Sequence, residues 1–119
     1  MTISINNFSS ERIPAELVAN AEKTILILNE IFAAFPGRFR FTSGYRSPAK
    51  NKSVGGVPDS YHVKALAGDF VPVDGRYPIE EKVGVNAIAA KHGYEVLIHK
   101  VNSGLHYHIE PLPGKRQRR

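Results

Sequence analysis

Apolar residues recur at three- and four-residue spacing in the first third of the chain, from Pro14 to Phe35. This period places them on one face of an α-helix, so we predict an amphipathic helix over residues 14–35 that contributes much of the core. Pro14 is suited to the first turn of a helix, where its missing N–H is not needed. The Pro36-Gly37 pair then ends the helix.

After this helix the pattern changes to an alternation of polar and apolar residues. Residues 38–43 alternate in this way around two phenylalanines, the period of a strand with one buried face. Basic and aromatic residues also alternate in platforms for single-stranded nucleic acid, but only two aromatics occur here and no other basic cluster is near, which favours the strand. The same reasoning predicts further elements: a short helical turn at 47–53, a loop at 57–66, strands at 67–73, 94–99 and 105–110, and a helix at 78–91.

These elements predict an α+β domain. The last three strands lie close together in the sequence, so we expect a small antiparallel sheet with the helices packed on one side. The buried side of the second helix is expected to comprise four apolar residues, Val83, Val85, Ile88 and Ala89.

Composition limits the class of protein further. The chain has 119 residues and no cysteine, which fits a single domain and excludes disulfides and thiolate metal sites. Its net charge of +5 is concentrated in a basic tail at 115–119, since residues 1–114 carry a net charge of only +1. We therefore expect that the domain, residues 1–114, does not bind nucleic acid and that the tail is solvated. We also expect the protein to be a monomer. Attraction of the tail to an anionic partner is the alternative. A small basic nucleic-acid-binding protein is the less favoured alternative for the function of the whole chain.

The sequence contains no apolar run of the ~20 residues that a membrane span requires. Its first residues also lack the charged and apolar regions of a signal peptide. We therefore expect synthesis in the cytoplasm and no stable insertion into a membrane.

Candidate metal ligands cluster in the second half of the chain. His62 and Asp69 flank the passage from the loop into a strand, and His106 and His108 lie two apart on another strand. Residues at i and i+2 share one face of a sheet, so two imidazoles and a carboxylate could surround one ion. Three protein ligands of this kind leave zinc an open position for water, although another divalent ion would be chemically tolerable.

The order of these motifs closely resembles that of the LAS-type zinc D-Ala-D-Ala carboxypeptidases, peptidase family M15. The resemblance extends from about Phe41 to Pro111 and rests on four segments: Ser43-Gly44-Tyr45-Arg46-Ser47-Pro48, Asn51 with Val54-Gly55-Gly56, Ser60-x-His62 with Ala67-x-Asp69, and His106-x-His108. It implies the fold of the Hedgehog and D-Ala-D-Ala peptidase-like domains and cleavage of peptidoglycan stem peptides. It also implies an enzyme of the phage or prophage lysis type, which acts on the cell wall after release or as part of a virion.

The resemblance assigns a role to each site residue. It makes His62, Asp69 and His108 the Zn²⁺ ligands. Arg46 would face the substrate and stabilise the developing oxyanion, and a guanidinium is suited to this because it has several donors. Two further residues are candidates for substrate binding: Ser60, beside the first ligand, and Tyr45, which could line the groove but could equally pack in the core.

Two positions depart from the pattern of the family. Ala65 replaces a glycine, and Leu105 replaces an acidic general base three residues before the last ligand. His106 is the first candidate for the base because an imidazole titrates near neutrality, and Glu110 is the second. If neither reaches the reacting water, the domain would bind metal without cutting peptides. We interpret the remaining histidines of this half, His92 and His99, as packed or surface residues.

Overall fold

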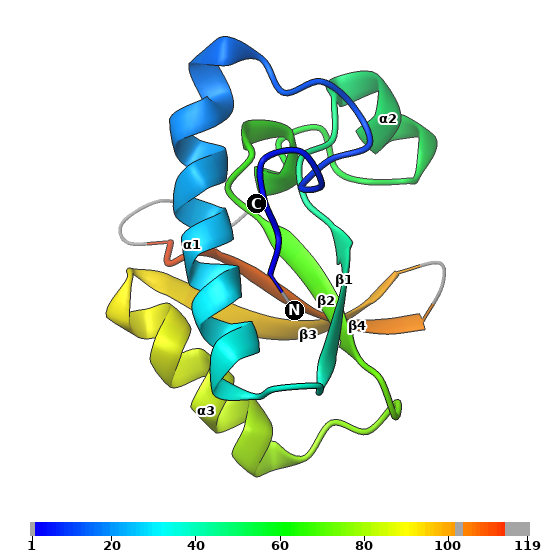
Figure 1. The fold of residues 1–119 in the computed structure, drawn as a ribbon. Coiled ribbons are helices and arrows are strands. Elements are labelled where there is room, and N and C mark those ends of the chain that lie inside the picture. The colour runs from blue at the N-terminus through cyan, green and yellow to red at the C-terminus, as the bar shows by residue number, and fades with distance from the viewer. Residues whose placement is uncertain (1, 102–103, 114–119) are drawn as a thin grey trace.

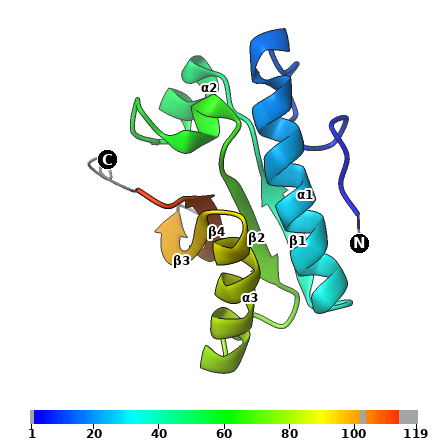
Figure 2. The same ribbon diagram turned by 90° about the vertical axis from the view of Figure 1, so that its left-hand side faces the viewer.

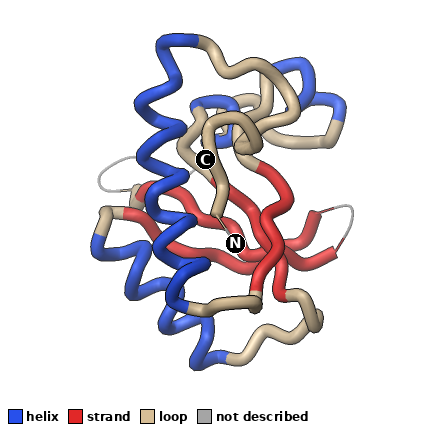
Figure 3. The backbone as a smooth tube through the Cα atoms, viewed as in Figure 1, coloured by secondary structure: helices blue, strands red, loops and turns tan. Residues whose placement is uncertain are grey.

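The computed structural model describes residues 2–101 and 104–113, which form a four-stranded sheet with helices. The elements are η1 (Ala15–Leu17), α1 (Val18–Ala34), β1 (Phe39–Ser43), α2 (Pro48–Ser53), η2 (Tyr61–Lys64), β2 (Gly68–Pro72), α3 (Ile79–Lys91), β3 (Tyr94–Val101) and β4 (Gly104–Pro111), where η denotes a 3-10 helix. Figure 3 shows how helices and strands follow each other along the chain. The predicted α+β architecture is confirmed.

The strands lie in the order β1-β2-β4-β3, and all three pairings are antiparallel. The central pair, β2 and β4, places Asp69 directly opposite His108. Between Phe41 and Ser43 the register of β1 against β2 shifts by one residue. The sheet is therefore regular through its centre and irregular at the end of β1.

Helices α1 and α3 cover one face of the sheet, while α2 and η2 gather at one of its ends (Figures 1 and 2). The interior is rich in aromatic rings because β1, β2 and β4 each contribute one to it. Phe39, Phe70 and Tyr107 pack with ring centroids 4.9–5.6 Å apart, and Phe32 of α1 completes the group. Burial of each such side chain contributes roughly 1.5–3 kcal/mol.

A polar network lies under the same face. The Tyr107 hydroxyl donates to Glu81 Oε1 at 2.6 Å, and the guanidinium of Arg38 donates to the other oxygen of that carboxylate. Arg38 also pairs with Asp74 at 2.7 Å. Burial and the hydrogen bond to Glu81 raise the pKa of Tyr107 far above its usual value. Glu81, in the first turn of α3, thus joins that helix to β4 and to the residue before β1.

The sequence-based boundaries need four corrections. The first helix begins as a 3-10 turn, because Leu17 N–H donates to the Pro14 carbonyl. The predicted loop at 57–66 contains the 3-10 helix η2. Val83 is 63% exposed rather than buried, because α3 presents Val85 and Ala89 to the core. Strands β3 and β4 are also longer than predicted.

The N-terminal segment, for which the sequence predicted no element, packs into the core. Ile3 and Phe8 are buried, and the Phe8 ring stacks on Phe41. Asn29 of α1 holds the segment through hydrogen bonds to both the N–H and the carbonyl of Ile3.

The basic tail at 115–119 lies outside the described residues. In the part of the chain that the structure describes, no helix is long and apolar enough to cross a bilayer.

Candidate metal centre

His62 is held in one orientation by the segment before β2. The Ser60 hydroxyl caps η2 by accepting from His62 N–H at 3.1 Å. The His62 Nδ1 lies 2.7 Å from the Gly44 carbonyl, to which it donates, and the Arg46 N–H donates to the His62 carbonyl at 3.1 Å. With Nδ1 engaged in this way, Nε2 is left as the ligand nitrogen. It lies 3.2 Å from Asp69 Oδ2.

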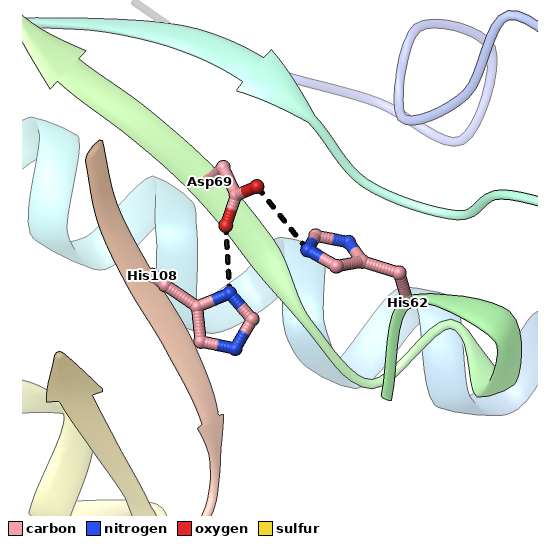
Figure 4. A group of neighbouring side chains, drawn as sticks. All are labelled: His62, Asp69 and His108. Carbon is pink, nitrogen blue, oxygen red and sulfur yellow. Dashed lines mark hydrogen bonds and ion pairs between the residues drawn. The ribbon is translucent and has the colours of Figure 1, made fainter. Parts of the chain in front are cut away.

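Asp69 and His108 are brought together by the pairing of β2 with β4. They are opposite each other in the register and on one face of the sheet, with Asp69 Oδ1 2.7 Å from His108 Nδ1. Figure 4 shows the carboxylate between the two imidazoles, with His62 approaching from η2. One ligand atom from each residue lies within 4.8 Å of the others, and all three side chains are buried. The trio predicted from the sequence is therefore assembled from three separate elements.

The chemistry of this group fits a bound cation. His62 Nε2 is buried and has no hydrogen-bond partner within residues 2–101 and 104–113, although it is close to a carboxylate oxygen. Burial favours the neutral form of Asp69, but the charge of His62 and the hydrogen bond from His108 outweigh it and hold the pKa of Asp69 well below its usual value. An ionised carboxylate beside an unpartnered imidazole nitrogen provides the donors that a divalent metal requires.

A second carboxylate orients His108 from the other side of its ring. Glu110, two residues along β4 and 2% exposed, lies 2.8 Å from His108 Nε2 through Oε1. Burial disfavours the imidazolium, yet the hydrogen bonds to Asp69 and Glu110 raise the pKa of His108 to about 9. A carboxylate that accepts from the distal nitrogen of a metal-bound histidine fixes its tautomer and orientation. Glu110 is therefore placed to orient a ligand.

His99, which we interpreted from the sequence as a packed or surface residue, lies at this centre. Its Nε2 is 3.8 Å from Asp69 Oδ1, and its ring is 4.6 Å from that of His108. The pairing of β3 with β4 brings His99 to this centre, because His99 is opposite His106 in the register. By contrast, His92 pairs with Glu30 on the surface between α1 and α3.

A hollow of about 900 Å³ opens over the three ligands. Besides the ligands, four further predicted site residues line it, namely Arg46, Ser60, His106 and Glu110. His106 is 6% exposed and its Nδ1 is 3.2 Å from the Gly104 carbonyl. Burial lowers the pKa of Arg46, opposed by the charge of Asp69, and the guanidinium remains protonated at neutral pH. Tyr45, by contrast, is packed in the core and does not line this hollow.

Several motif residues have structural roles that explain their spacing. Gly44 approaches the N-terminal segment so closely that a Cβ there would be 2.2 Å from the Phe8 carbonyl oxygen. The Asn51 amide donates to the Val57 carbonyl at 2.6 Å. A Cβ at Gly56 would be 2.1 Å from the side-chain oxygen of Asn51. Ala65 has φ 59°, the left-handed conformation that favours the glycine found in relatives.

A comparison with family models gives one match, to the family described as Peptidase M15, over residues 5–108. The matched range includes all three candidate ligands together with Arg46, Ser60 and His106. A search of curated proteins found no matching relative.

Proposed function

The chain belongs to the peptidase M15 family, and we propose that it is a zinc-dependent peptidase that hydrolyses peptide bonds in peptidoglycan stem peptides. One observation carries the proposal: His62, Asp69 and His108 converge from three elements, and the buried His62 Nε2 among them has no hydrogen-bond partner in the described residues. The zinc site rests on this donor set of two imidazoles and one carboxylate, in a chain without cysteine. The peptidoglycan substrate rests on the family resemblance of the motifs.

When bound, zinc supplies a water of lowered pKa and polarises the substrate carbonyl. The side chains around it have complementary tasks. Arg46, on the wall of the hollow, stabilises negative charge that develops on the carbonyl oxygen. Ser60 holds η2 and hence His62 in position. Glu110 orients His108 through the 2.8 Å hydrogen bond.

We assign the general base to His106. Residue 105, where relatives carry an acid, lies in β4 three positions before His108, so its side chain lies on the opposite face of the strand. Leu105 is accordingly 51% exposed and away from the ligands. His106 shares the face of His108 and lines the hollow, and an imidazole on this face supports the assignment. The second candidate, Glu110, is already hydrogen-bonded to His108.

The stem peptides of peptidoglycan lie outside the cytoplasmic membrane. We therefore propose that the enzyme acts on the wall after release from the cell or as part of a virion, in the manner of a phage or prophage lysis enzyme.

The experiment that tests this function is the release of new amino groups from purified peptidoglycan. We expect release by the purified chain, loss of release with a chelator, and recovery on addition of zinc. His62→Ala should be inactive, whereas His92→Ala, the matched control on the far surface, should retain activity. One equivalent of bound zinc with no release from any wall type would instead establish a metal-binding domain without hydrolytic activity, the alternative that Leu105 favours.

A further inference from the structure

A second hollow, of about 570 Å³, adjoins the one over the candidate metal centre. It is bounded by the N-terminal segment 6–10, the end of β1 and the helix α2. The two hollows have four lining residues in common: Thr42, Ser43, Arg46 and Val54. The space over the ligands therefore continues past Arg46 instead of ending there.

The junction between the hollows contains two buried polar atoms without partners. Thr42 Oγ1 and Arg46 Nε have no hydrogen-bond partner within the described ranges 2–101 and 104–113. Thr42 is the extra residue of β1, since Phe41 is opposite Phe70 and Ser43 is opposite Asp69. A bulge of this kind re-aims a side chain and is common beside active sites. A ligand that crosses the junction passes the Thr42 side chain and the Arg46 guanidinium, which line both hollows.

The lining of the second hollow is mixed. Beyond the junction it contains amide and hydroxyl side chains, three aromatic residues of which one is Tyr45, and Lys50 of α2, with no carboxylate. The nearby Glu11 accepts hydrogen bonds from both the N–H and the hydroxyl of Ser47, and its charge also interacts with Lys50, although it forms no ion pair with that residue. Amides and hydroxyls bind peptide groups, and an ammonium binds a carboxylate. This surface therefore suits an extended peptide that has an acidic group.

We propose that the second hollow is a substrate subsite, in which the peptide crosses Thr42 and Arg46 and directs a carboxylate toward Lys50. This subsite rests on the proposed function, since it extends the site of the same reaction. It makes the preferred substrate longer than the dipeptide at the cleaved bond. Thr42 and Lys50 are then substrate-binding residues that the motifs did not indicate.

Two peptides test the subsite: acetyl-D-Ala-D-Ala and the complete stem pentapeptide. Calorimetric titration of the metal-loaded chain gives the Kd of each peptide, and chromatography of the mixture shows whether it is cut, in which case KM is compared instead. We expect the pentapeptide to bind roughly tenfold more tightly than the dipeptide. Lys50→Ala should weaken pentapeptide binding by about threefold to tenfold and leave dipeptide binding unchanged, whereas Thr42→Val should weaken pentapeptide binding by a similar factor and dipeptide binding by less.

Matched variants separate a subsite from a general defect. Lys52→Ala removes a lysine from the same helix that lines neither hollow, and should have no effect. Thr42→Ser keeps the hydroxyl and should retain most of the affinity. Equal affinities for the two peptides, or equal effects of Lys50→Ala and Lys52→Ala, would overturn the subsite while leaving the proposed function intact. Length-dependent binding without cleavage would support the subsite and contradict the proposed function, and no binding of either peptide would contradict both.

Discussion

The two faces of β4 are both buried but differ in how their polar groups are satisfied. On the face toward α1 and α3, Tyr107 donates to Glu81, whose other oxygen accepts from Arg38. On the opposite face, His108 bonds to Asp69 and Glu110, yet the neighbouring His62 Nε2 has no hydrogen-bond partner in the described residues. An unsatisfied buried group costs stability, typically about 1–3 kcal/mol. The polar groups on the face toward α1 and α3 are therefore satisfied within the protein, whereas those on the opposite face become satisfied when a ligand binds.

Removing a metal ligand should have the largest effect on metal binding and hydrolysis, and this effect should be confined to the face of β4 that carries His108. His62→Ala, Asp69→Ala and His108→Ala each delete one of three ligands, so we expect zinc affinity to fall on the order of 10²-fold or more, with no measurable hydrolysis. Elemental analysis of the purified variants measures retained zinc. His92→Ala serves as the control. Full zinc occupancy in the His62 or His108 variant would show that the trio is not the metal centre.

His106→Ala tests whether the face of β4 that carries the metal ligands also contains a separate general base. We expect zinc to remain bound and the turnover number to fall by ~10²–10⁴-fold, the range for loss of a general acid or base. His99→Ala, across the strand pair, is the comparison: it removes an imidazole near Asp69 but none that we assign to proton transfer. Turnover that survives in His106→Ala and disappears in His99→Ala would transfer the role of base to His99.

The ligand face should also respond to pH. In the protein without metal, Asp69 and Glu110 raise the pKa of His108 to about 9, so its ring is protonated at neutral pH. A metal must displace one of these protons, and its affinity should therefore increase as the pH rises toward 9, by roughly tenfold per pH unit for one proton. Titration against a competing chelator at pH 6, 7 and 8 measures this slope. Constant affinity across that range would contradict the protonated state.

A substitution on the face of β4 toward α1 and α3 should have the smallest effect, and this effect should be on stability alone. Tyr107→Phe removes the hydroxyl from a fully buried ring and leaves Glu81 with one partner fewer, which we expect to cost about 1–3 kcal/mol of unfolding free energy. Urea denaturation measures the loss, while zinc content should stay at the wild-type value. A Tyr107→Phe variant that loses zinc as readily as His108→Ala would show that the two faces are not independent.

Local patterns in the sequence were sufficient for most of the fold. The three- and four-residue period of the first helix and the alternation in the strands depend on nearest neighbours, and these elements appear where predicted, with shifts at their ends. Three features depend on distant contacts and were not predicted. Phe8 is buried against Phe41 from a segment without periodicity. Glu81, an acidic residue of the first turn of α3, is buried with Tyr107. Val83 is exposed because the orientation of α3 is set by what it packs on.

By itself, the sequence determined the helices, the strands and the alternation that gives β4 two faces. Its motifs also indicated His62, Asp69 and His108 as one set of candidate ligands. The tertiary structure decided which side chains meet. The pairing of β2 with β4 sets Asp69 against His108, the pairing of β3 with β4 adds His99, and the bulge in β1 places Thr42 between two hollows. The physical reason is that periodicity is a property of neighbouring residues, whereas strand register is fixed by the packing of the whole sheet.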